Sequence, residues 1–186
     1  MKFNNHYSLT GAHAFLSASK FHWIRYDEAK LERLFKMHMA AKRGSDMHDV
    51  AKELIRLGIR LDPTIKTTLN MYVNDAIGYK MRPEQVLYFS ANCYGTTDAI
   101  IFRDNLLRIF DLKTGVNQSS MDQLKIYAAL FCLEYDHDPF MIEIELRIYQ
   151  NDEIKMEEPD PLEVSNIIEQ IKFFDKKLNA LMKEAE

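Results

Sequence analysis

The sequence predicts an α/β (α+β) domain in which helices flank a mixed sheet. Residues 85–113 are rich in Val, Ile, Tyr and Phe and divide into three strands, and residues 139–152 alternate as a fourth. Apolar residues recur at helical spacing before, between and after these strands, and this order favours a mixed sheet. We expect one domain over 1–186, with a mainly helical part (1–82), a strand–hairpin–helix–strand core (83–150) and a C-terminal helix (159–186).

The helical part divides at a glycine. Residues 27–44 and 45–58 are expected to form two helices, because Gly44 is a typical stop and Ser45 a typical N-cap. Two more helices are expected over residues 65–81 and 119–135.

The C-terminal segment predicts a long amphipathic helix. Asp160 and Pro161 are typical of a helix start. One side of the helix is apolar, which predicts packing against the body of the chain or, alternatively, a homo-oligomer formed through this helix.

Composition limits the classes of protein. The chain of 186 residues carries a formal charge of −4, which argues weakly against non-specific coating of nucleic acid but leaves room for a local basic groove. No apolar run is long enough to cross a bilayer, and the first eleven residues lack the apolar centre of a signal peptide. We therefore expect a soluble cytoplasmic protein without a membrane partner.

The chemistry begins at a tight hairpin. Asp104 and Asn105 both tolerate a positive φ and are expected to form a two-residue turn. Counting outward from that turn places Asp98 directly opposite Asp111, with Cβ atoms about 5 Å apart. The two carboxylates would repel each other, and a divalent cation such as Mg²⁺ held by both would relieve that repulsion.

Lys113 is expected to share a strand face with Asp111, whereas Leu112 points into the core. An ammonium group there is placed to orient a water molecule and to stabilise the pentavalent transition state of phosphodiester hydrolysis. The alternatives are a solvated Asp–Lys pair and a salt bridge across the hairpin.

Three residues outside the strands bear on this site. Gln123 and Tyr127 are one helical turn apart and share a face; such a tyrosine is usually a core residue, whereas the glutamine needs hydrogen-bond partners. His48 stands near a helix start, where a lone histidine is more often a surface or core residue.

Basic residues nearby suggest contacts with DNA. Lys125 adds positive charge close to Lys113, while Lys42 and Arg43 either meet phosphates or remain a solvated pair.

Aromatic residues near the N-terminus leave two interpretations open. Phe21 and Trp23 stand close to Lys20 and Arg25, and they either anchor a core or stack on single-stranded DNA.

Four motifs in order resemble the RecB-like nucleases of the PD-(D/E)XK superfamily. The motifs are GSDMH (44–48), GTTDAI around Asp98, DLKTG (111–115) and QLKIY (123–127), and LSASKFHW near the start resembles the entry segment of that family. The chain is similar in particular to small phage-type members related to CRISPR-associated exonucleases. The resemblance implies a restriction-endonuclease-like core.

The resemblance also implies roles for individual residues. His48, Asp98 and Asp111 would bind Mg²⁺ or Mn²⁺, with the Leu112 carbonyl as a further ligand. Lys113 would be the catalytic lysine, and the two remaining motif residues, Gln123 and Tyr127, would form the wall of the active site beside the DNA strand.

The function implied is a metal-dependent DNA nuclease acting in phage or bacterial recombination, replication or repair. An exonuclease acting on linear double- or single-stranded DNA in the bacterial cytoplasm is expected. Many relatives carry four cysteines for an iron–sulfur cluster, but this chain has only Cys93 and Cys132, so no cluster is expected. The alternative is a non-catalytic protein with the nuclease fold that binds DNA or a partner protein.

Overall fold

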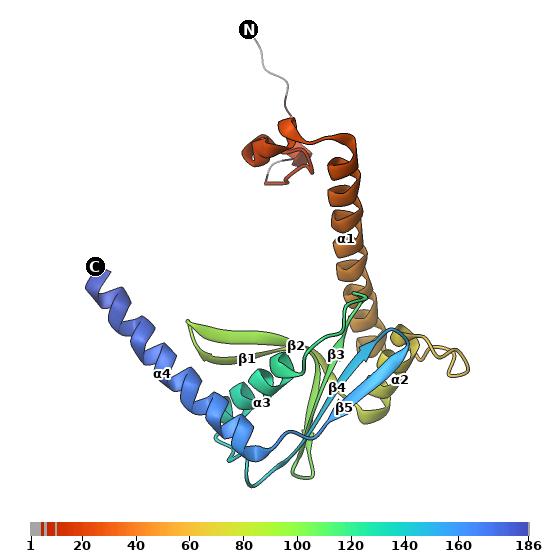
Figure 1. Ribbon diagram of the computed structural model, residues 1–186. Coiled ribbons are helices and arrows are strands. Elements are labelled where there is room, and N and C mark those ends of the chain that lie inside the picture. Colours follow the sequence, from red (N-terminus) through yellow and green to blue (C-terminus); the bar gives the residue numbers. More distant parts are fainter. Residues whose placement is uncertain (1–4, 6, 10, 186) are drawn as a thin grey trace. The chain divides into compact units, whose positions relative to one another are not determined.

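The structure is a computed structural model that describes residues 5, 7–9 and 11–185 (Figure 1). The expectation about a signal peptide rests partly on residues 1–4, 6 and 10, and the end of the predicted C-terminal helix falls on residue 186; all of these lie outside the described residues. The chain divides into two compact units, residues 1–43 and 44–186.

The first unit is short and helical. It contains the 3₁₀ helices η1 (Tyr7–Leu9) and η2 (Ala18–Arg25) and the first part of α1 (Glu28–Leu57). None of the residues whose exposure is described between 5 and 43 is buried. This unit therefore lacks a core of its own in the described chain.

The second unit is built on a five-stranded mixed sheet with the order β1-β2-β3-β4-β5. Neighbouring strands are antiparallel except β3 and β4, which are parallel because helix α3 connects them. This confirms the predicted mixed sheet flanked by helices. The strands are β1 (Arg82–Ser90), β2 (Cys93–Arg103), β3 (Leu106–Leu112), β4 (Glu143–Gln150) and β5 (Glu153–Glu157).

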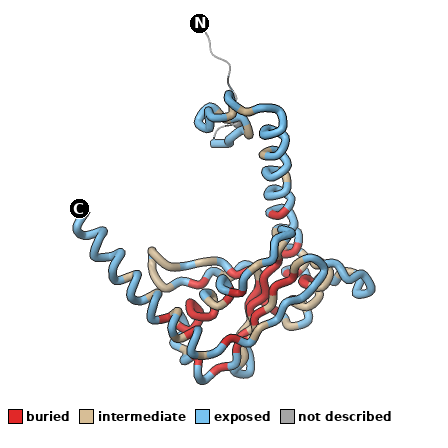
Figure 2. The backbone as a smooth tube through the Cα atoms, viewed as in Figure 1, coloured by how far each residue is buried: buried red, intermediate tan, exposed pale blue. Residues whose placement is uncertain are grey.

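Helices cover both faces of the sheet, and the buried residues lie in the strands and in the helices that pack on them (Figure 2). On one face α3 (Asp122–Glu134) and the start of α4 (Pro161–Ala185) pack on alternate residues of β2, β3 and β4. On the other face α2 (Thr68–Tyr79) and the last turns of α1 pack on the intervening residues. Strand residues that point to either face of the sheet are consequently buried.

The expectation of two helices separated at Gly44 is wrong. A single helix, α1, runs through this position, and Ser45 caps nothing. Gly44 is buried there, and a Cβ on it would lie 2.6 Å from Oγ1 of Thr114. A glycine inside a helix costs about 1 kcal/mol, and here it permits the close approach of the loop after β3.

Strand β4 also differs from the expectation of one buried and one solvated face. Ile142, Ile144 and their alternating partners are buried as predicted, but Met141 is exposed and Tyr149 on the opposite face is buried. The reason is that α2 covers that second face. Strand β5 was not predicted, because its sequence EIKME is mostly charged and its residues are largely exposed at the sheet edge.

The C-terminal helix begins as predicted, with the Asp160 carboxylate accepting a hydrogen bond from the amide of Leu162 at 2.8 Å. The first half of its apolar stripe packs on the core, through the buried Val164 and Ile168 and the half-buried Ile167 and Ile171. Farther along, Leu178 and its apolar neighbours are exposed. A homo-oligomer through this helix stays a prediction, and this distal stripe is where it would form.

Candidate active site

The site is assembled by the hairpin between β2 and β3. Asp104 and Asn105 have φ angles of 51° and 63°, as a two-residue turn with left-handed central residues requires. Pairing runs from Arg103↔Leu106 to Ala99↔Phe110, which is the predicted register. The next residue of β2, Asp98, accepts a hydrogen bond from the backbone amide of Leu112 at 2.8 Å.

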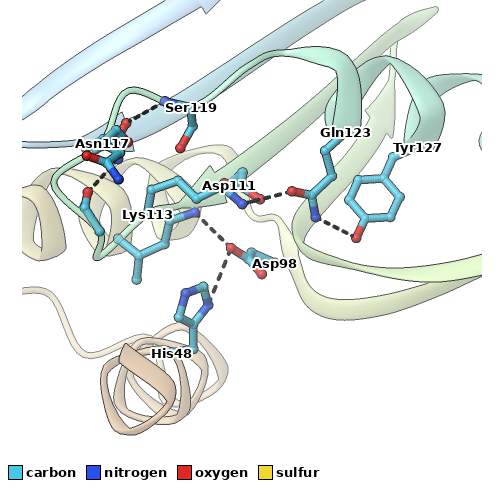
Figure 3. Close-up of polar contacts among 11 residues, drawn as sticks. His48, Asp98, Asp111, Lys113, Asn117, Ser119, Gln123 and Tyr127 are labelled. Carbon is cyan, nitrogen blue, oxygen red and sulfur yellow. Dashed lines mark hydrogen bonds and ion pairs between the residues drawn. The ribbon is translucent and has the colours of Figure 1, made fainter. Parts of the chain in front are cut away.

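His48 reaches this hairpin from α1. Its Nδ1 lies 3.4 Å from Oδ2 of Asp98, and both side chains are partly exposed. The hydrogen bond to Asp98 raises the pKa of His48, although burial opposes the shift; the charge of Asp111 also raises it. The pKa of the imidazole therefore depends on both carboxylates (Figure 3).

Asp111 is the buried acid of the site, with 3% of its surface exposed. Burial raises its pKa, and the negative charge of Asp98 adds to the effect; Lys113 and His48 only partly offset it. Its Oδ1 accepts a hydrogen bond from Nζ of Lys113 at 3.1 Å. Its Oδ2 lies 3.0 Å from the same nitrogen but has no hydrogen-bond partner among the described residues.

A chain of polar contacts extends from the lysine into α3 (Figure 3). Nζ of Lys113 donates to Oε1 of Gln123 at 2.8 Å, and Nε2 of Gln123 donates to the hydroxyl of Tyr127 at 3.1 Å. The Tyr127 ring lies against the backbone of Gly95, where an added Cβ would be 2.8 Å from Cε1. The glutamine thus has the polar partners that its place on this helix requires.

The loop after β3 is held by a residue that the sequence did not single out. Nε2 of Gln150 donates to the carbonyl oxygens of Gly115 and Asn117 at 2.5 and 2.7 Å, and its Oε1 accepts from the amide of Ser119 at 3.1 Å. These contacts position the end of the DLKTG segment. A glutamine at the end of a strand carries no signal of this role, because its partners are more than thirty residues away.

The predicted basic contacts are distributed differently. Lys125 is not brought to the group around Lys113, because its Nζ pairs with Glu157 at 2.7 Å and Glu163 at 2.8 Å. Lys42 and Arg43 are exposed residues at the end of the first unit.

The donor types in the site suit a hard divalent cation. Two carboxylates and an imidazole are ligands for Mg²⁺ or Mn²⁺, and the buried oxygen Oδ2 of Asp111 has a free acceptor position in the described chain. No group of three or more His, Cys, Asp or Glu residues among those described is arranged as a metal site. The residue types suit a cation. In this structure the amide of Leu112 donates to Asp98, and the ammonium group of Lys113 pairs with Asp111.

Fold and site together define an α/β protein whose mixed sheet carries a two-carboxylate, one-lysine cluster on a hairpin. Residues 79–185, more than half of the chain, match the family described as "Protein of unknown function (DUF2800)". The chain belongs to this family. The matched segment includes the carboxylates, the lysine and the α3 residues of the cluster, whereas His48 precedes it.

Other comparisons add no relative. No curated protein and no solved structure matches the chain. Within the described part of the chain, every helix is too short or too polar to cross a membrane.

Proposed function

We propose that this protein is a Mg²⁺- or Mn²⁺-dependent deoxyribonuclease of the RecB-like PD-(D/E)XK type, acting as an exonuclease on phage or bacterial DNA in the cytoplasm. The observation that carries the proposal is the meeting of two acids and a lysine on one hairpin. Asp111 is kept in a buried position that opposes its charge. A carboxylate that is shielded from water and lies next to a second acid is typical of a functional site.

His48, Asp98 and Asp111 would hold the cation. The cation would supply Lewis-acid polarisation of a phosphate oxygen and would neutralise the two facing carboxylates. Burying Asp111 next to Asp98 does not favour folding, because burial and then repulsion by Asp98 raise the pKa of Asp111. A binding role for the pair supplies that reason.

Lys113 would act on the phosphate. In hydrolysis, a water oxygen forms a bond to phosphorus while the bond to the sugar oxygen breaks, and negative charge grows on the phosphoryl oxygens. An ammonium group held in advance stabilises this charge without reorganising during the reaction. Asp111 and Gln123 hold the Lys113 ammonium at 3.0 and 2.8 Å, respectively, and Tyr127 in turn orients Gln123.

The test is cleavage of end-labelled linear DNA, double- and single-stranded, with Mg²⁺, Mn²⁺ or EDTA. Asp111→Asn and Lys113→Met keep the side-chain size and remove the charge, and each is expected to abolish cleavage. Asp104→Asn removes an acid from the exposed tip of the same hairpin and should cleave like the wild type. Full activity in either site variant would refute the proposal.

The alternative is a nuclease-like protein that binds DNA or a partner without cutting. One observation favours it: Lys113 already neutralises Asp111 in an arrangement that needs no cation. Calorimetric titration with Mn²⁺ separates the two functions. Heat of binding that disappears in Asp111→Asn supports the nuclease, whereas no heat and no cleavage support the alternative.

A further inference from the structure

The charge of this chain is divided unequally between its two compact units. Residues 1–43 contain eight Lys or Arg and three Asp or Glu, a net charge of +5, and four of the six histidines. Residues 44–186 contain sixteen basic and twenty-five acidic residues, a net charge of −9. The overall charge of −4 therefore conceals a basic module attached to an acidic one. A polyanionic ligand would be attracted to the first unit and repelled by most of the second.

The aromatic residues described in the basic unit are exposed or half-buried, and none is fully buried. The side chains of Phe21 and Phe35 are 53% and 48% exposed. A cavity of about 270 Å³ opens in the same unit, and Phe15, Trp23 and Tyr26 contribute to its lining. Phe35 contacts Phe15 edge-on, with ring centres 5.3 Å apart, but about half of its surface stays exposed and is available to a ligand.

A hydrogen bond orients one aromatic ring of this unit, and a cation lies close to another. The indole N–H of Trp23 donates to the carbonyl of Ser17 at 2.9 Å, which holds the ring edge. Nζ of Lys30 lies 4.4 Å from the centre of the Tyr26 ring. Lys20 lines the cavity as well, and no acidic residue is among the described residues that line it. Positive charge interleaved with fixed aromatic rings is the pattern of surfaces that track a phosphate backbone and stack on unpaired bases.

We infer that the N-terminal unit binds single-stranded nucleic acid through residues 11–43. The phosphates are attracted by the basic residues, including Lys42 and Arg43, and bases stack on the aromatic residues around the cavity. Single strands are favoured over duplex because the bases of a duplex are already stacked on each other. The inference goes beyond the proposed nuclease activity, since binding here requires neither a metal ion nor cleavage.

A competing occupant is the acidic unit of a second copy of this chain, which has complementary charge but offers no bases for the aromatic rings. This possibility is one outcome of the test below.

The experiment uses the full chain in EDTA, so that cleavage cannot contribute. Labelled 20-mers of dT and of U, and a duplex of the same length, are titrated at several salt concentrations and followed by fluorescence anisotropy. Trp23 is the single tryptophan of the chain, so quenching of its fluorescence reports contact at the proposed site directly. Single strands should quench Trp23 and bind at least about 10-fold more tightly than duplex, with a salt slope of about −0.7 for each phosphate neutralised. The two oligonucleotides show whether DNA or RNA is preferred.

Variants separate stacking from charge. Trp23→Ala should weaken binding by about 5- to 140-fold, the effect of losing one stacking aromatic, with little change in salt slope. Lys20→Gln should instead reduce the salt slope by about 0.7. Phe21→Ala, at an exposed position, replaces Trp23→Ala if the latter fails to fold. Matched controls in the acidic unit are Tyr94→Ala, at a ring that is 64% exposed, and Lys176→Gln; both should bind like the wild type.

Three results would overturn the inference. These are no quenching of Trp23 by any oligonucleotide, unchanged binding in the Trp23, Phe21 and Lys20 variants, and salt-sensitive self-association by light scattering without oligonucleotide binding. The last result would assign the basic unit to a second copy of the chain. None of these outcomes depends on the cleavage test with Asp111→Asn, so either proposal can fail alone.

Discussion

Replacing Gly95 by alanine tests whether the wall of the candidate site is as closely packed as the structure indicates. The new Cβ would lie 2.8 Å from Cε1 of Tyr127, whereas ordinary contacts begin at 3.4 Å. The ring must therefore retreat by at least about 0.6 Å. Because the Tyr127 hydroxyl accepts from Gln123, and Gln123 accepts from Lys113, the displacement is transmitted toward the ammonium group.

The magnitude follows from two opposing effects. Overpacking against a rigid ring costs about 1–3 kcal/mol. Replacing a glycine inside a strand returns about 0.5–1 kcal/mol, because alanine loses less backbone entropy on folding. We expect Gly95→Ala to lower the free energy of unfolding by about 0.5–2 kcal/mol. With an m-value of about 2 kcal/mol/M, the urea midpoint falls by about 0.3–1 M.

The assay is urea unfolding followed by far-UV circular dichroism, because Trp23 lies in the other compact unit and its fluorescence would not report on this packing. Gly78→Ala is the matched control: its Cβ would meet only Nη2 of Arg60, at 3.8 Å, so it should be as stable as the wild type or more stable. In a Tyr127→Ala background, where the ring is absent, Gly95→Ala should cost nothing. An equal cost in both backgrounds, or a variant as stable as the wild type, would refute the close packing of Gly95 on Tyr127.

Three further predictions concern other contacts. Gly44→Ala should stabilise the protein more in a Thr114→Ala background than in the wild type, because the new Cβ lies 2.6 Å from the Thr114 hydroxyl. Without that hydroxyl, the gain in helix propensity is up to about 1 kcal/mol. If Gly44→Ala changes the free energy of unfolding equally in both backgrounds, this contact is contradicted. Burial raises the pKa of Cys132 to about 11, so alkylation of the native protein at pH 8, followed by mass spectrometry, should be far slower than after unfolding; rapid native labelling would count against its burial. Arg147→Met removes the cation 2.8 Å from Oε1 of Glu145, a buried oxygen, and leaves that carboxylate only its pairing with Arg108. The fold should lose about 3 kcal/mol in chemical denaturation, and an unchanged midpoint would show that the pair is dispensable.

The hairpin is the part of the site that the sequence predicted most fully. Asp104 and Asn105 favour a two-residue turn, and the turn sets the pairing register, which extends to Ala99↔Phe110. Asp98 and Asp111 are the next residues of the two strands, and the charge of Asp98 acts on Asp111. Every step involves residues fewer than fifteen positions apart. The alternation of a strand then puts Lys113 on the same face as Asp111, where the two side chains pair.

Elements that depend on distant partners were predicted less well. Gly44 is a reasonable helix stop by local propensity, but α1 continues through it, because one glycine costs only about 1 kcal/mol and its missing Cβ leaves room for Thr114. Lys125 is close in sequence to Gln123 but pairs with glutamates of β5 and α4. Tyr149 is buried because α2 covers its face of the sheet. Alternation along β4 contains no information about that helix.

By itself, the sequence determined the mixed sheet, the hairpin register and the meeting of two acids with a lysine, because turn preference and strand alternation act between near neighbours. Tertiary structure alone decided that His48 contacts Asp98, that Gln123 holds Lys113, and how deeply Asp111 is buried. Those outcomes depend on how helices separated from the hairpin in the chain pack against it. Solvent exclusion and the resulting pKa of a carboxylate are properties of that packing, and the residue order alone does not contain them.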